Sequence, residues 1–120
     1  MSITSLVTVA VLQCAPASLV GVVDGDTFDA RAHFLNVHVD MRVRILGIDA
    51  PELRGGTSET KVLANKAKAW LWNRLAGVPF TVCTSGTDSF GRWLATVMVG
   101  NMPIGPDMIE AGLATEYEGK

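Results

Sequence analysis

The chain has few cysteines and histidines and no long apolar run. Only two of its 120 residues are cysteine, which excludes a disulfide-dense scaffold and a zinc site built from cysteines alone. His33 and His38 are its only histidines, so neither a CxxC nor an HxxxH metal-binding pattern occurs. No apolar run reaches the roughly 18 residues that a membrane-spanning helix needs, and we therefore expect no stable membrane association.

An excess of positive charge is also missing. Lys and Arg number 10 against 12 Asp and Glu, for a net charge of −2. This balance excludes a protein that holds nucleic acid mainly through a global positive field. It does not exclude an enzyme that contacts phosphates locally, because a bound metal and a few arginines can supply positive charge at the site itself. The length and the 48% hydrophobic content predict one domain with its own core, and we expect a monomer.

The first 17 residues have two alternative interpretations. An apolar stretch followed by residues 15–17 (APA) is typical of a secretory signal peptide with its A-x-A cleavage site, which predicts a periplasmic or secreted protein. However, no Lys or Arg precedes Arg31, so the usual basic start is missing. The alternative is a terminal strand or a disordered leader, in which case the protein is cytoplasmic. Cleavage after Ala17 would leave Cys83 as the only thiol, and its strand-like context favours a small buried hydrophobe.

Residues 18–120 predict one domain with the element order β-β-β-α-β-β-α. The alternation of apolar and polar residues over 37–45 predicts a half-buried strand. Apolar residues spaced by three and four over 57–76 predict a long helix capped by Thr57 or Ser58. Further strands are expected over 19–23, 27–32, 80–84 and 92–99, and a short helix over 108–111. This pattern indicates a mainly β protein with helices (α+β), a five-stranded OB-fold barrel with one long and one short helix.

Polar residues gather at three points where strands are expected to begin or end. They are residues 24–27 (DGDT), 49–52 (DAPE) and 88–92 (DSFGR). We expect Gly25 to let the backbone bend so that Asp26 points inward. If the strands are neighbours, these three segments converge on one pocket.

The first two segments carry the residues that a hydrolytic metal site needs. A hard divalent cation prefers oxygen ligands, and Asp26, Asp49 and the backbone carbonyl of Ala50 can supply them. Glu52 follows a proline and can act as general base on a water molecule.

Two arginines complete the set. The planar guanidinium groups of Arg44 and Arg92 match the oxygens of a phosphate. Taken alone, each of these features is more typical of an ordinary turn, loop or solvated strand face than of a functional site. It is their joint presence, order and spacing that indicates phosphoryl chemistry, which requires a metal, a positioned water and fixed positive charge.

The same segments carry a resemblance to a known family. Residues 23–27 (VDGDT), 42–52 (RVRILGIDAPE) and 88–92 (DSFGR) resemble the three signature segments of the staphylococcal-nuclease-like (thermonuclease) family. Residues 111–114 (AGLA) are similar to the family's closing helix motif. The resemblance runs from about Ser18 to Tyr117.

The resemblance implies an OB-fold enzyme that hydrolyses DNA and RNA phosphodiesters with Ca²⁺ and leaves 3′-phosphates and 5′-hydroxyls. It implies these site residues: the Ca²⁺ ligands Asp26, Asp49 and the carbonyl of Ala50, the general base Glu52, and Arg44 and Arg92 on the scissile phosphate. The chain departs from well-known members in carrying Ser89-Phe90 where they have Lys-Tyr, and Tyr117 is the most that remains of their base-stacking tyrosines.

Two functions follow as hypotheses. The first is a Ca²⁺-dependent nuclease that acts on single-stranded DNA or RNA. The alternative is a non-catalytic OB-fold module that binds nucleic acid or protein. Retention of all the implied acidic and basic site residues favours the enzyme, because a module that only binds has little need of them.

Overall fold

The computed structural model describes residues 12–118. In chain order its elements are β1 (Gln13–Asp24), β2 (Thr27–Phe34), β3 (Val37–Ile45), β4 (Ile48–Asp49), α1 (Ser58–Leu75), β5 (Phe80–Thr87), β6 (Trp93–Val99), β7 (Met102–Pro103), α2 (Ile104–Glu110) and β8 (Thr115–Glu116). Neither helix of this part of the chain is long and apolar enough to cross a membrane.

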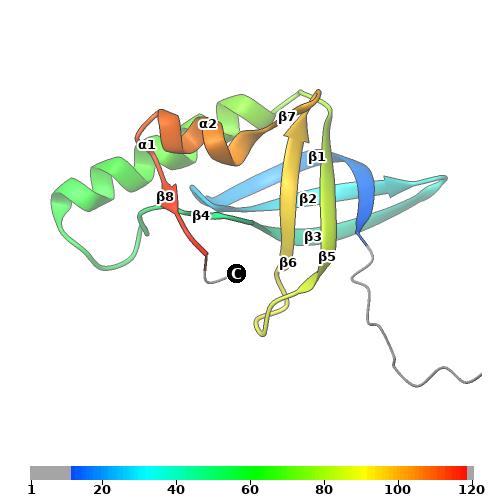
Figure 1. Cartoon of the computed structure of the whole chain (residues 1–120), viewed down its shortest axis with the longest axis horizontal. Coiled ribbons are helices and arrows are strands. Elements are labelled where there is room, and N and C mark those ends of the chain that lie inside the picture. Colours follow the sequence, from blue (N-terminus) through cyan, green and yellow to red (C-terminus); the bar gives the residue numbers. More distant parts are fainter. Residues whose placement is uncertain (1–11, 119–120) are drawn as a thin grey trace, which may run out of the picture.

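The five long strands form a closed barrel (Figure 1). Their order is β3-β2-β1-β5-β6, with antiparallel neighbours, and a parallel contact between β3 and β6 closes the ring. Inside it, Phe28 and Phe80 pack edge to face with ring centroids 5.8 Å apart. Leu71 and Leu75 of α1 are fully buried in the same core. The predicted five-stranded OB-fold barrel with one long and one short helix is thus confirmed.

Helix α1 begins where the sequence predicts it. The Thr57 side chain caps it by accepting a hydrogen bond from the backbone N–H of Thr60, at 3.2 Å. The buried face of the helix carries the small residues Ala64 and Ala67, both fully buried, and Ala67 lies against Gly25 in the turn between β1 and β2. Their size lets the helix approach that turn closely, which matters for the site below.

The structure confirms the strand predicted over residues 37–45 but buries only the second half of its apolar face. Val43 and Ile45 are buried in the barrel, whereas Val37 and Val39 are 59% and 40% exposed. The reason is that β1 pairs with β2 only as far as Ala32. Beyond that point the β2–β3 hairpin extends out of the barrel without a third strand to cover it (Figure 1).

Strand β1 begins at Gln13, inside the segment for which the sequence suggested a leader. Ala15 and Ala17 are buried, and Cys14 lies opposite Cys83 of β5, to which it is joined by a disulfide bond. Cys83 is therefore a disulfide partner here and not a free buried thiol. The part of the suggested leader that falls on residues 1–11 lies outside the described residues.

Candidate functional site

The carboxylate of Asp26 is held between two segments that lie far apart in the sequence. Asp26 occupies the turn between β1 and β2 and is 7% exposed. Its Oδ2 accepts a hydrogen bond from the backbone N–H of Ala50, at 2.9 Å, and its Oδ1 accepts one from the hydroxyl of Thr27, also at 2.9 Å. The turn is thereby tied to the segment after β4, and the carboxylate has one fixed direction.

Gly25 serves this site for a different reason from the one expected. Its φ angle is not in the left-handed region, so the turn does not require the conformational freedom of glycine. Instead, a Cβ atom at this position would lie 2.5 Å from the Cβ of Ala67 and 2.9 Å from the Cβ of Ala50. The absence of a side chain allows α1 and the segment after β4 to close on the turn.

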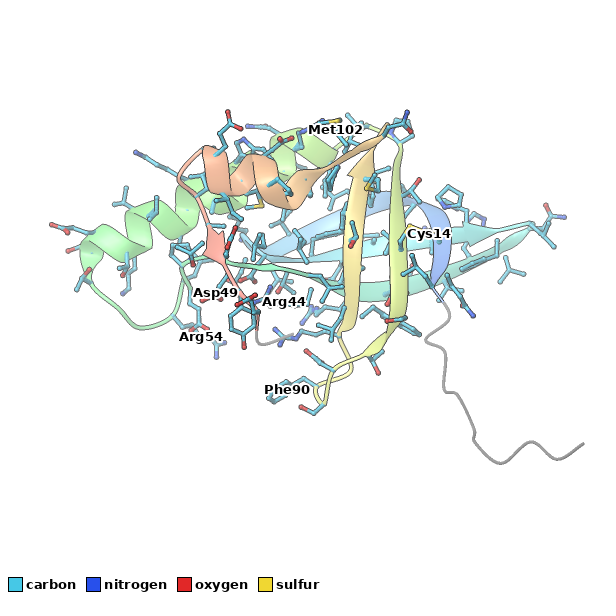
Figure 2. All side chains as sticks on the ribbon, in the orientation of Figure 1. Cys14, Arg44, Asp49, Arg54, Phe90 and Met102 are labelled. Carbon is cyan, nitrogen blue, oxygen red and sulfur yellow. A yellow bond between two sulfur atoms is a disulfide. The ribbon has the colours of Figure 1, made fainter. Side chains whose placement is uncertain are left out.

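Arg44 joins the two aspartates predicted to hold a metal. It lies on β3, is 7% exposed, and donates from Nη1 to the carbonyl oxygens of Ile45 and Ile48, both at 2.8 Å. Its Nη2 is 3.4 Å from Oδ1 of Asp49 and 3.6 Å from Oδ2 of Asp26. Figure 2 shows the Arg44 and Asp49 side chains close together. The structure thus brings Asp26, Arg44 and Asp49 together.

These groups fit a hard cation in kind. Asp26 and Asp49 approach one point beside Arg44, and the side chain of Asp49 is 57% exposed, so a cation can reach it from solvent. A carboxylate has about four acceptor positions, so the bonds to Asp26 leave it free lone pairs. Among residues 12–118 no group of three or more His, Cys, Asp or Glu gathers. A bound cation would therefore take further oxygens from water and from a backbone carbonyl such as that of Ala50.

Glu52 forms no hydrogen bond or ion pair with this cluster or with any other group among the described residues. It is exposed in the segment after β4. Its carboxylate is thus open to solvent on the same short segment that carries Asp49 and Ala50. A cavity of about 230 Å³ is lined by Asp49 and Ala50 together with residues 112–115. A larger hollow of about 610 Å³ between β1 and α1 contains none of the predicted site residues.

Arg92 is positioned by Asp88, whose role the sequence did not reveal. Asp88 Oδ1 accepts from the backbone N–H groups of Phe90 and Arg92, at 2.9 and 3.0 Å, and its Oδ2 accepts from Nε of Arg92 at 2.8 Å. Burial alone would raise the pKa of Asp88, but the hydrogen bonds from Arg92 and Phe90 and the Arg92 charge outweigh it, so this pKa is lowered.

The structure does not bring Arg92 into contact with Arg44 or either metal-site aspartate. The parallel register of β3 and β6 sets Leu94 opposite Arg44, so Arg92 lies two residues before the position facing it. Asp88 holds only the Nε of Arg92. Among the described residues, the two terminal nitrogens of Arg92 have no hydrogen-bond partner. Figure 2 shows Phe90 at the tip of the same loop, pointing away from the barrel.

Tyr117 covers Arg44, a contact that sequence reasoning missed. Strand β8 pairs with β4, and the N–H of Tyr117 then donates to the carbonyl of Gly47 at 2.9 Å. The tyrosine ring lies 5.6 Å from Cζ of Arg44, within cation–π range. Strands of two residues have no detectable alternation, so no local pattern predicted this contact, and only the resemblance linked Tyr117 to the site.

Comparisons with known proteins agree with this architecture. A family model described as "Staphylococcal nuclease homologue" matches residues 42–120. The chain is 36% identical over 87 residues to "Probable endonuclease LCL3" of Paracoccidioides lutzii, covering 67% of this chain and 25% of that protein. It is 30% identical over 105 residues to the protein of the same name in Saccharomyces cerevisiae, covering 76% of this chain and 38% of that one. The chain thus spans well under half the length of these curated relatives.

Proposed function

Because this chain belongs to the staphylococcal nuclease homologue family, we propose that it is a Ca²⁺-dependent nuclease that cleaves single-stranded DNA or RNA as a monomer. The observation that carries the proposal is the convergence of two carboxylates on one buried arginine, Asp26 and Asp49 on Arg44. The names of the relatives, probable endonucleases, support cleavage within the strand.

In this proposal, Asp26, Asp49 and the carbonyl of Ala50 would hold the cation, which when bound would supply positive charge next to the scissile phosphate. Arg44 is already fixed by the carbonyls of Ile45 and Ile48, so its guanidinium does not reorganise during the reaction. It donates hydrogen bonds to phosphate oxygens as negative charge develops on them.

Glu52 accepts the proton of the attacking water in the proposed step. The water oxygen forms a bond to phosphorus, the bond from phosphorus to the 5′ oxygen breaks, and the leaving oxygen takes up a proton to become a 5′-hydroxyl. The phosphate stays on the 3′ side. The free terminal nitrogens of Arg92 suit the bidentate binding of that phosphate, while Asp88 holds Nε of the same group.

A cleavage assay with matched variants tests this proposal. Single-stranded DNA and RNA are incubated with Ca²⁺ and then with a chelator, using the parent chain, Glu52→Gln, and Glu110→Gln as a control that removes one exposed carboxylate at the end of α2. We expect Ca²⁺-dependent cleavage that Glu52→Gln lowers by roughly a hundredfold or more, since that is what a general base contributes. Glu110→Gln should cleave like the parent.

The outcome separates the enzyme from the alternative module. Full activity in Glu52→Gln would remove that residue from the mechanism. Binding of single strands without turnover under any divalent cation would favour the non-catalytic module instead.

We also propose that the protein works in an oxidising compartment, as a secreted or periplasmic protein. The support is the disulfide between Cys14 and Cys83, because such bonds persist mainly outside the reducing cytosol. Cleavage after Ala17 would remove the first five residues of β1, Cys14 among them. A leader that is processed must therefore be cut before Gln13 to keep this barrel. N-terminal sequencing and non-reducing mass analysis of the native protein test this. A native protein in which Cys14 and Cys83 are both present and reduced would contradict it.

A further inference from the structure

The β2–β3 hairpin carries a pair of histidines where it leaves the barrel. His33 of β2 lies directly opposite His38 of β3. Their Nδ1 atoms are 2.7 Å apart, and the two rings stand nearly perpendicular, at 89°, with centroids 4.7 Å apart. These are the only histidines of the chain, and both cysteines are in the disulfide. The hairpin thus concentrates all the imidazole nitrogen of the protein at one point.

A third residue orients one of the two rings. Oγ of Ser18 on β1 is 3.3 Å from Nε2 of His33. In the tautomer with its proton on Nε2, His33 donates to this hydroxyl, and its Nδ1 accepts a hydrogen bond from Nδ1–H of His38. A metal that binds both Nδ1 atoms takes the place of this shared proton, and His38 then carries its proton on Nε2. A metal-binding histidine is generally held in this way, by an oxygen that accepts from the ring nitrogen away from the metal.

We propose that His33 and His38 bind one transition-metal dication, Cu²⁺ or Ni²⁺ in preference to Zn²⁺, through their two Nδ1 atoms, with water completing the coordination. At a metal–nitrogen bond length of about 2.0 Å, two neighbouring nitrogens of a square plane lie ~2.8 Å apart, whereas a tetrahedral site separates them to ~3.3 Å. The observed 2.7 Å is the length of a hydrogen bond between the two rings, and it already places the two nitrogens close to the first value. The general order of affinities also places Cu²⁺ above Zn²⁺ at such ligands.

The surroundings tolerate an added positive charge. The next pair on the same face of the hairpin is Arg31 with Asp40, joined at 2.8 Å, so it contributes no net charge. His33 is half-buried and His38 exposed, which gives the ion access from solvent. The site also differs in kind from the Asp26–Asp49 site, because imidazole nitrogen suits borderline transition metals and carboxylate oxygen suits Ca²⁺.

Such an ion would join β2 to β3 just where no third strand covers them. An ion that binds only the folded chain stabilises it by mass action, and the free energy grows with ion concentration. The bound metal would therefore stabilise the pairing of the two strands reversibly and independently of the proposed nuclease activity.

Titration of a tag-free protein tests the proposal. Calorimetry with Cu²⁺ and Ni²⁺ should give one ion per chain, and the electron paramagnetic resonance spectrum of the Cu²⁺ form should show two coordinated nitrogens. With Ni²⁺, the imidazole NMR signals of both histidines should move or broaden, and the melting temperature should rise. Excess Ca²⁺ should not displace either ion.

Substitutions decide whether the pair is responsible. His33→Gln and His38→Gln should each reduce the affinity at least tenfold and abolish the thermal shift, with circular dichroism confirming that both variants fold. Glu52→Gln, at the other site, should bind like the parent. The proposal is overturned if millimolar Ni²⁺ neither produces heat nor shifts the imidazole signals, or if binding survives both histidine substitutions.

Discussion

The contact between Gly25, α1 and the segment after β4 makes Gly25→Ala an informative substitution. The new methyl group would lie 2.5 Å from the Cβ of Ala67 and 2.9 Å from the Cβ of Ala50, whereas carbon atoms in contact are normally about 3.5–4.0 Å apart. Relief of the overlap requires a movement of about 1 Å. Both neighbours are themselves single methyl groups on backbone, so no flexible side chain can swing away, and the helix or the segment after β4 must shift.

The expected effects follow from that shift. Overpacking of this size costs roughly 1–3 kcal/mol, which for a domain of this length lowers the melting temperature by about 4–12 °C. Movement of Ala50 also stretches the 2.9 Å bond from its N–H to Asp26 and displaces Asp49 beside it. Misplacement of a reacting group by about 1 Å typically costs on the order of a hundredfold in rate. We therefore expect Gly25→Ala to lose both stability and Ca²⁺-dependent cleavage.

Gly21→Ala is the matched control, because a Cβ at Gly21 meets no atom within 4 Å and its φ is not left-handed. It should leave stability unchanged or raise it by up to about 1 kcal/mol, through the lower entropy of its unfolded chain. Urea unfolding of both variants, followed by tryptophan fluorescence, gives the two free energies, and the cleavage assay gives the rates. If Gly25→Ala matched Gly21→Ala in both measurements, the close-packing explanation would be refuted.

Three further outcomes are expected. Under oxidising conditions, Cys83→Ser should have a free energy of urea unfolding about 4 kcal/mol lower, at most, than that of the parent chain. This is the entropic contribution of a disulfide that closes a loop with a sequence separation of 69 residues. Reduction of the parent chain should have the same effect. Because the pKa of Asp88 is lowered in the folded protein, its contribution to stability is complete above the ordinary pKa of Asp, about 3.9, and is lost as the pH falls through the lower folded value. In that acidic range, the melting temperature of Asp88→Asn should therefore depend less on pH than that of the parent chain. Tyr117→Leu removes the ring next to Arg44, a contact worth roughly 0.5–1 kcal/mol. If that contact is the whole contribution of Tyr117, cleavage should slow by no more than about fivefold. A much larger loss in kcat would show that Tyr117 takes a direct part in the reaction.

Local patterns in the sequence predict many of the helices and strands of the fold. The spacing of apolar residues and the Thr57 cap predict α1, and the alternation over 37–45 predicts β3, because these features depend on neighbours within a few positions. The positions of Asp26 and Asp49 at strand ends followed from the same local signals. Their meeting at Arg44 could only be expected from resemblance, since no local rule relates residues more than 20 positions apart.

Contacts between distant segments decided the rest. The burial of Val43 but not Val39, the pairing of Cys14 with Cys83, and the position of Tyr117 over Arg44 all depend on which strands lie side by side. The same holds for Gly25, whose requirement comes from α1 and not from its own backbone angles. The hydrophobic and conformational preferences of a residue act within its own segment and set the elements. Register, closure of the barrel and the contacts of the site arise only when the elements pack together, because each of them depends on two or more segments at once.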